Sequence, residues 1–291
     1  GQMAFEGNRI IRERIAKYSI KCDLKNGGVF AAFTSKQMRH LEHQRKLWAR
    51  HGHNTVDMLD KKQMSDVVGS DVYVGGSIDH SGGHIHSLKL ALGEAAAIES
   101  LGGQIYEQSP AIRIERGAKP VVITEQGRVN ARIVVVAGNA YLGNLVPELT
   151  AKSMPCGSQV VTTAPLPADL AKSLIPKDYC IEDCNYLLDY YRLTGDNRLL
   201  YGGGVIYGAR DPKNVEAIIR PKMLKTFPQL KNVKIDYAWT GNFLLTLSRL
   251  PQVGTLGEHN NIFYSQGCSG HGITYTHLAG KVLSEAIIGH R

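Results

Sequence analysis

The stretch that decides the fold is Ile262-Phe263-Tyr264-Ser265-Gln266-Gly267-Cys268-Ser269-Gly270-His271-Gly272-Ile273. Its apolar start predicts a β-strand, its three glycines predict a tight loop, and the periodic apolar residues from 273 to 288 predict a helix. Glycine lets a backbone approach a ligand, and the free N–H groups at a helix start attract negative charge. The loop is therefore either a binding loop for a phosphate or an electron-rich ring, or a plain βα turn. It is not the Gly-x-Ser-x-Gly elbow of hydrolases, because His271 stands where the second glycine is required.

The composition is that of an ordinary globular chain. Its 291 residues are 43% hydrophobic, which is enough to bury a sizeable core. No apolar run reaches the roughly 20 residues that a membrane span needs, and the first residues lack the pattern of a signal peptide. The five cysteines are odd in number and scattered, which is typical of a reducing compartment. We therefore expect a cytoplasmic protein without a membrane partner.

The formal net charge of +8 does not indicate nucleic-acid binding. A binding groove needs clustered Lys and Arg, whereas here the basic residues are spread along the chain. In the densest stretch, residues 36–50, they alternate with acidic and apolar residues, as on a solvated helix face. We expect no nucleic-acid partner, although the positive charge could favour an anionic cofactor or substrate.

Hydrophobic periodicity predicts a mixed α/β fold whose two halves interleave. Helices are expected at residues 5–18, 35–51, 61–68, 87–101, 213–225 and 273–288, and short strands between them. The run 133–137 is apolar at every position, which predicts a strand covered on both faces. In the strand predicted at 186–193, alternation sends Tyr190 and Arg192 to one face and Tyr191 to the other. Either set could line a pocket or pack within the sheet.

The histidines do not predict a metal site. His84 and His86 would share a strand face, but no third ligand of suitable spacing accompanies them. Cys180 and Cys184 span one helical turn without a second cysteine pair. We expect no bound metal.

The closing loop resembles the flavin-contacting loop of the D-amino-acid-oxidase-like flavoproteins. Five further segments match the family in its order along the chain: residues 79–86 (Asp-His-Ser-Gly-Gly-His-Ile-His), 136–143, 153–157 (Ser-Met-Pro-Cys-Gly), 183–192 and 239–249 (beginning Trp-Thr-Gly). Each segment is a weak signal alone, and together they are specific.

The resemblance implies that the chain binds FAD. In the family, the strand that ends at Ala137, Gly138 and Asn139 runs beneath the FAD diphosphate. The flavin ring would contact the closing loop through Gly267, Ser269, Gly270, His271, Gly272 and Ile273. Sarcosine oxidases attach their flavin to a cysteine near the Trp-x-Gly segment, and no cysteine occurs between residues 184 and 268. The FAD should therefore be noncovalent.

The implied reaction is the oxidation of an amine. The substrate gives hydride to the flavin, the imine hydrolyses to an aldehyde and ammonia, and dioxygen reoxidises the flavin with release of hydrogen peroxide. The helix start at His271 would stabilise negative charge on the reduced flavin, which makes His271 a catalytic candidate. A flavin dehydrogenase that uses another electron acceptor, and a cofactor-free ligand-binding fragment, remain alternatives.

The resemblance also indicates substrate and oxygen contacts. Sarcosine oxidases use a lysine to assist oxygen reduction, and the nearest match is Arg210, which could instead pair with Asp211. Glycine-oxidase-like relatives bind the substrate carboxylate with an arginine where this chain has Phe243. An amine without an adjacent carboxylate, such as an acylated polyamine, is therefore favoured. Tyr190, Arg192 and Phe243 are the candidate substrate-binding residues.

The family's architecture implies a truncated FAD-binding Rossmann-like domain interleaved with a mixed-sheet substrate domain. Residues 1–76 and 151–250 would belong mostly to the substrate domain. Residues 77–150, with a β-meander, and residues 251–291 would belong to the FAD-binding domain. The Gly-x-Gly-x-x-Gly loop of the family's first βαβ unit does not occur in the chain. We therefore expect a fragment that is inactive by itself.

Overall fold

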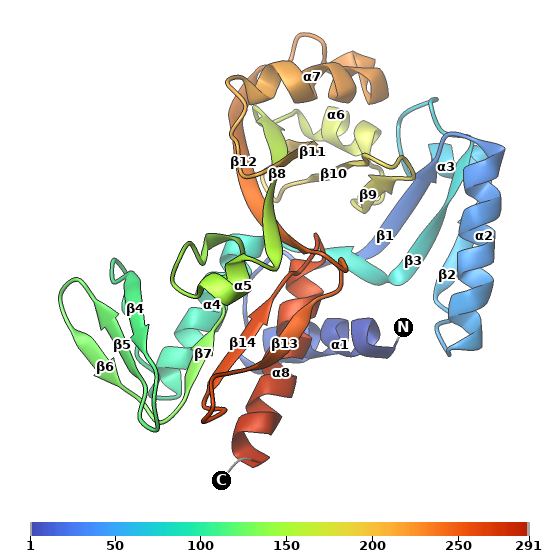
Figure 1. Cartoon of the computed structure of the whole chain (residues 1–291). Helices are drawn as coiled ribbons and strands as arrows, with labels where there is room; N and C mark the ends of the chain where they lie inside the picture. Colours follow the sequence, from blue (N-terminus) through green and yellow to red (C-terminus); the bar gives the residue numbers. More distant parts are fainter. Residues whose placement is uncertain (1, 290–291) are drawn as a thin grey trace.

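The computed structural model describes residues 2–289 and is built around an eight-stranded mixed sheet (Figure 1). Its strand order is β12-β8-β11-β10-β9-β1-β3-β2, and all neighbours are antiparallel except β1 and β9. The strands are β1 (Lys25–Ala32), β2 (Val56–Leu59), β3 (Gly75–His84), β8 (Ser153–Thr163), β9 (Cys180–Asp183), β10 (Asp189–Leu193), β11 (Leu199–Tyr207) and β12 (Ile235–Thr246). The sheet therefore joins two stretches of the chain that are far apart in sequence.

Two smaller sheets complete the β-structure. The first has the order β13-β14-β7, with β7 (Val134–Val136) parallel to β14 (Ile262–Gln266) and β13 (Gln252–Leu256) antiparallel to it. The second is the predicted meander, formed by β4 (Ala111–Glu115), β5 (Val121–Thr124) and β6 (Arg128–Asn130). It lies at the left of Figure 1, where Ile114 and Val122 pack against the cluster of Val134, Val136 and Ile262. The mixed α/β fold class predicted from the sequence is confirmed.

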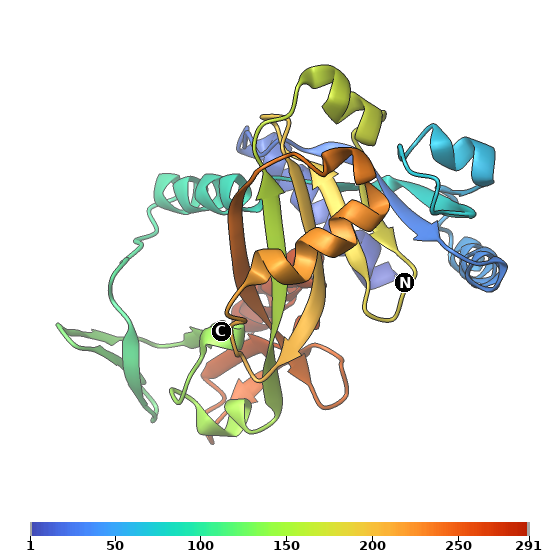
Figure 2. The ribbon, with the colours of Figure 1, turned by 90° about the horizontal axis from the view of Figure 1, so that it is seen from above.

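The helices lie on both sides of the large sheet (Figure 2). They are α1 (Gln2–Lys17), α2 (Ser35–Arg50), α3 (Lys61–Ser65), α4 (Ser87–Ser100), α5 (Pro147–Thr150), α6 (Ala168–Leu174), α7 (Val215–Thr226) and α8 (Gly272–Gly289), with 3₁₀ turns η1 (Asn139–Tyr141) and η2 (Pro228–Leu230). A capping box explains where α2 begins, because Thr34 and Gln37 satisfy each other's backbone N–H groups. No helix within residues 2–289 has the length and apolar character needed to cross a bilayer.

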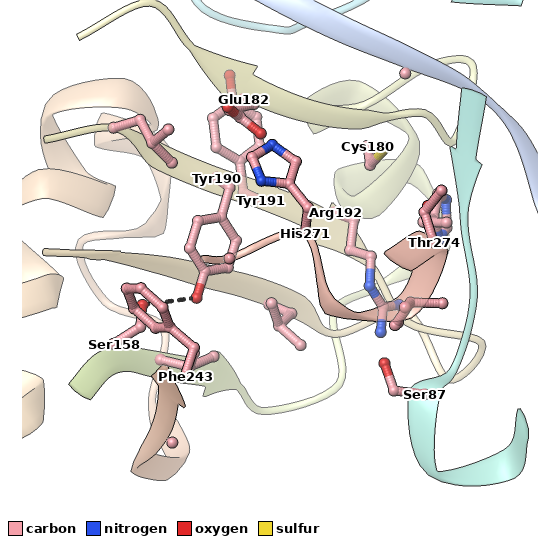
Figure 3. Close-up of a pocket in the computed structure, with 18 of the residues that line it drawn as sticks. Ser87, Ser158, Cys180, Glu182, Tyr190, Tyr191, Arg192, Phe243, His271 and Thr274 are labelled. Atoms are coloured by element: carbon pink, nitrogen blue, oxygen red, sulfur yellow. Dashed lines mark hydrogen bonds between the residues drawn. The ribbon is translucent and has the colours of Figure 1, made fainter. Parts of the chain in front are cut away.

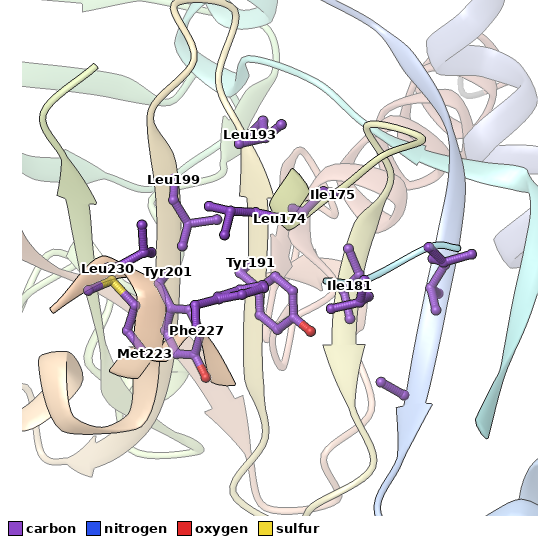
Figure 4. Close-up of a cluster of buried hydrophobic side chains, with 14 of the residues drawn as sticks. Leu174, Ile175, Ile181, Tyr191, Leu193, Leu199, Tyr201, Met223, Phe227 and Leu230 are labelled. Carbon is purple, nitrogen blue, oxygen red and sulfur yellow. The ribbon is translucent and has the colours of Figure 1, made fainter. Parts of the chain in front are cut away.

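The main core lies between the large sheet and helices α6 and α7 (Figure 4). At its centre, the ring of Tyr191 stacks on Tyr201 with centroids 5.2 Å apart and meets Phe227 edge-on at 5.1 Å. The Tyr191 hydroxyl donates a hydrogen bond of 2.8 Å to the hydroxyl of Tyr73, so the buried phenol is satisfied. Tyr191 therefore anchors the core, and its strand neighbours point to the opposite face.

One prediction about burial was wrong. The strand β7 is not covered on both faces, because Val135 is 46% exposed while Val134 and Val136 are buried. The two buried valines pack with Leu149 and Ile262, and no described element covers the other face. The unbroken apolar run at 133–137 therefore does not correspond to a strand buried on both faces within residues 2–289. The domain boundaries stay a prediction; the one placed between residues 76 and 77 falls inside β3.

Replacing Leu174 by alanine should test the core. Leu174 is 0% exposed, and its truncation should lower the free energy of unfolding by about 2 to 5 kcal/mol because it removes apolar contact and leaves a cavity. Urea-induced unfolding followed by circular dichroism measures the change. The matched control is Leu101→Ala, because Leu101 is 71% exposed and should change stability by no more than about 0.5 kcal/mol. Equal losses in both variants would contradict this assignment of the core.

Candidate functional site

A cavity of about 930 Å³ opens between the large sheet and the first turn of α8 (Figure 3). This volume is in the range of small-molecule sites. The sheet contributes polar and aromatic side chains, and the closing loop contributes backbone. Among the lining residues are Ser158, Glu182, Tyr190, Arg192 and Phe243 from the sheet, and Ser269, Gly270, His271, Ile273 and Thr274 from the loop and helix.

The closing loop has the strand-loop-helix form that the sequence predicts. Gly267 and Gly270 have φ of +79° and +92°, and Ser269 between them also lies in the left-handed region with φ of +50°. A Cβ on Gly267 would clash with the methyl group of Thr246, whereas a Cβ on Gly270 would meet only open space. Gly267 is therefore required by the packing of the loop, and Gly270 leaves the approach to the helix start open.

The second predicted cofactor segment holds this loop from behind. The side chain of Asn139 accepts a 3.0 Å hydrogen bond from the backbone N–H of Gly267 and donates one of 3.4 Å to the sulfur of Cys268. Ala137, Gly138 and Asn139 do not line the cavity. The structure thus brings the two predicted segments into contact, while a direct role for these three residues in cofactor binding stays a prediction.

The three substrate candidates share the cavity. Strand alternation sends Tyr190 and Arg192 toward it and Tyr191 into the core. The Tyr190 hydroxyl lies 3.1 Å from the hydroxyl of Ser158, and burial raises the pKa of Tyr190, so the phenol stays neutral. Phe243 lines the same space from β12. These side chains could contact a ligand with both apolar and polar parts.

Arg192 brings a positive charge that is not neutralised locally. Burial lowers the pKa of its guanidinium, which forms no ion pair with a carboxylate of residues 2–289. Its one hydrogen bond runs from Nη1 to the carbonyl oxygen of Leu193 at 3.0 Å. Figure 3 shows its guanidinium directed toward Ser87, near Thr274. Its remaining N–H groups are available to an anionic or carbonyl group.

Sequence reasoning missed Glu182. The strand β9 that carries it has four residues and only one large apolar side chain, so no periodicity marks it. The one feature that could have pointed to Glu182 is its partner in the sheet, Tyr190, which lies in a strand that the sequence does predict. Burial raises the pKa of the Glu182 carboxyl, and the nearby His271 opposes this shift. Figure 3 shows the imidazole of His271 facing this carboxylate.

Arg210 lies outside this group of residues. It is exposed in the turn after β11 and does not line the cavity. The neighbouring Asp211 accepts a hydrogen bond from Thr240, not from Arg210. A role for Arg210 in oxygen reduction stays a prediction.

Comparisons with known proteins show the family and the fold of the chain. The family model described as FAD dependent oxidoreductase matches residues 1–286. The chain is 60% identical over 290 residues to gamma-glutamylputrescine oxidoreductase of Escherichia coli (strain K12), covering 99% of this chain and 68% of that protein. It is 24% identical to glycine oxidase of Bacillus subtilis (strain 168), covering 90% of this chain and 69% of that protein.

Solved structures show the same fold. L-proline dehydrogenase from P. horikoshii superposes with a TM-score of 0.86 at 18% identity, covering 99% of this chain and 79% of that chain. Glycine oxidase from Geobacillus kaustophilus gives a TM-score of 0.84 at 21% identity and covers 98% of this chain. The chain belongs to the DAO family of FAD-dependent oxidoreductases.

The residues of the closing loop fit a flavin ring. The start of α8 opens onto the cavity, and the space in front of Gly270 is free. The first N–H groups of a helix have no partners within the helix, so they can donate to an electron-rich edge. We therefore expect the backbone of Gly270 and Ile273 to be placed to hold the ring, with Gly267 and Asn139 supporting the loop. The N–H of His271 already donates a 2.9 Å hydrogen bond to the carbonyl oxygen of Cys268, so His271 would contribute its side chain.

Replacing Gly267 by alanine should damage this loop. The positive φ and the clash with Thr246 should lower the free energy of unfolding by about 1 to 3 kcal/mol and reduce the amount of FAD retained after gel filtration. The matched control is Gly280→Ala in helix α8, which follows the loop, because a Cβ there meets nothing and alanine should stabilise by about 0.5 to 1 kcal/mol. If Gly267→Ala retains wild-type stability and FAD content, the loop does not depend on this glycine.

Proposed function

We propose that the protein uses noncovalent FAD to oxidise gamma-glutamylputrescine, or a similarly acylated polyamine, to an aldehyde, with release of ammonia and hydrogen peroxide. The observation that carries the proposal is the 60% identity, over 99% of the chain, to a protein named gamma-glutamylputrescine oxidoreductase. The cavity supports it independently, because it combines aromatic walls with separate acidic and basic side chains.

The cavity suits an extended amine better than a small amino acid. Phe243, Trp239 and Leu245 line it from β12, and they offer apolar surface to a chain of methylene groups. Phe243 stands where the resemblance would require an arginine for a carboxylate next to the reacting carbon. Tyr190, Ser158 and Arg192 offer hydrogen bonds to the polar parts of an acylated substrate.

The start of α8 would assist the reaction electrostatically. When bound, FAD would accept the electrons of the amine and pass them to dioxygen. The backbone N–H groups near His271 are fixed by the loop, so they can stabilise developing negative charge without rearranging. His271 lines the same cavity and is the candidate catalytic side chain. Arg210 remains the candidate for oxygen reduction, from the family resemblance alone.

Anaerobic addition of gamma-glutamylputrescine to the full-length, FAD-loaded protein should bleach the visible flavin absorbance, because the amine reduces the cofactor. Admission of air should restore the absorbance and release hydrogen peroxide, which a peroxidase-coupled assay measures. Glycine is the matched control and should bleach the flavin far more slowly. Phe243 occupies the position where an arginine would bind the carboxylate of glycine.

The outcomes separate the alternatives. Bleaching without peroxide formation in air would indicate a dehydrogenase with another electron acceptor. Binding of the amine by protein that takes up no FAD would indicate a cofactor-free binding protein. FAD-loaded protein that no amine bleaches would refute the proposed oxidation.

A further inference from the structure

We propose that Glu182 is the anionic anchor for the ammonium group of the substrate and thereby selects amines. The inference rests on the proposed function and deepens it, since it assigns one end of the substrate to one side chain. Neither the sequence patterns nor the family resemblance singled out this residue.

The position of Glu182 is fixed by the two-residue period of the strands. Within β9, all three of Cys180, Ile181 and Glu182 border the cavity, but Ile181 is 1% exposed and packs in the core, whereas Cys180 and Glu182 are partly exposed. Glu182 pairs with Tyr190 on one side and with Phe30 of β1 on the other. A strand in the interior of a sheet holds its side chains rigidly, so the carboxylate has a defined place in the cavity wall.

The charge environment leaves this carboxylate without an ion-pair partner among the described residues. Glu182 is the only acidic residue among the described residues that line the cavity. Its carboxylate forms no hydrogen bond or ion pair with another residue of the range 2–289, and the nearby His271 acts on it only through its charge. Other partly buried carboxylates of the chain have close partners: Asp79 lies 2.8 Å from His53, and Asp189 lies 2.7 Å from Lys222.

An unpaired, half-buried carboxylate is costly, and a bound ammonium would relieve the cost. Removal of a charged group from water is unfavourable unless an opposite charge or hydrogen-bond donors replace the water. An alkylammonium supplies a positive charge and up to three N–H donors. The guanidinium groups that line the cavity, such as that of Arg192, form no ion pair with Glu182, so they do not neutralise its carboxylate.

The aromatic surroundings fit the same ligand. Tyr190 lies beside Glu182 in the sheet, and Figure 3 shows its ring between Glu182 and the Ser158 and Phe243 end of the cavity. Aromatic faces attract ammonium groups and pack against methylene groups. A chain that starts at Glu182 with its ammonium can therefore run along Tyr190 toward Phe243.

The first test measures binding without turnover. The probe is tert-butylamine, an ammonium at neutral pH that has no C–H bond on the carbon bearing nitrogen and cannot be oxidised to an imine. Its uncharged isostere, tert-butanol, reports contacts that do not depend on charge. Isothermal titration of the FAD-loaded protein should show that Glu182→Gln weakens tert-butylamine binding roughly 10- to 100-fold, since a charged hydrogen bond is lost. Binding of tert-butanol should not change.

Two further variants sharpen the result. Glu182→Asp keeps the charge on a shorter side chain and should retain part of the affinity for the probe. Glu125→Gln is the matched control, because Glu125 is exposed in the turn between β5 and β6 and should leave binding at the wild-type level. In turnover assays with gamma-glutamylputrescine, Glu182→Gln should raise KM by a similar factor, with a smaller effect on kcat.

The failure of this inference can be distinguished from failure of the proposed function. If wild-type protein oxidises the amine while Glu182→Gln binds tert-butylamine as tightly as wild type, the anchor is wrong. If Glu182→Gln changes only thermal stability or FAD content, Glu182 supports the His271 loop and does not bind substrate. If no amine is oxidised, the two probes still decide whether Glu182 binds an ammonium.

Discussion

The alternation of side chains along β9 and β10 is the constraint on which the rest of the structure depends. One face of these strands contributes Ile181 and Tyr191 to the main core, and the other contributes Glu182, Tyr190 and Arg192 to the cavity. Because the period is two, a shift in register by one residue would exchange the two sets. The stacking of Tyr191 on Tyr201 opposes such a shift, so core packing also fixes the position of the site.

Much of this fold could be predicted from the sequence, for identifiable reasons. Long periodic segments such as α2 and α8 were found because several turns repeat the same pattern. Strand β12 runs unbroken from Ile235 to Thr246, longer than the short strands that the sequence predicts. Its middle, around Gly241 and Asn242, lacks the apolar residues that predict a strand. Backbone pairing with the long β8 keeps this part extended. Tertiary pairing of this kind is not visible in local sequence.

The candidate site was predictable only where it is built from local sequence features. The glycine loop and the alternation of Tyr190 and Arg192 are local features, and the structure brings them to one cavity. Glu182 lies in a strand that local pattern does not mark, and the contact of Asn139 with the loop joins residues more than one hundred positions apart. Arg210 is a candidate from the family resemblance alone, and the structure places it in an exposed turn.

The parallel pairing of β1 with β9 has a consequence for how the chain folds. This pairing joins Gly28 to Cys180, and it connects the two halves of the large sheet. Contacts between such distant residues incur the entropy of closing a long loop before they contribute stability. During synthesis, β1, β2 and β3 emerge long before β9 and must wait with one edge unpaired. Until β9 pairs with β1, that open edge can pair with another chain, as unpaired strand edges do.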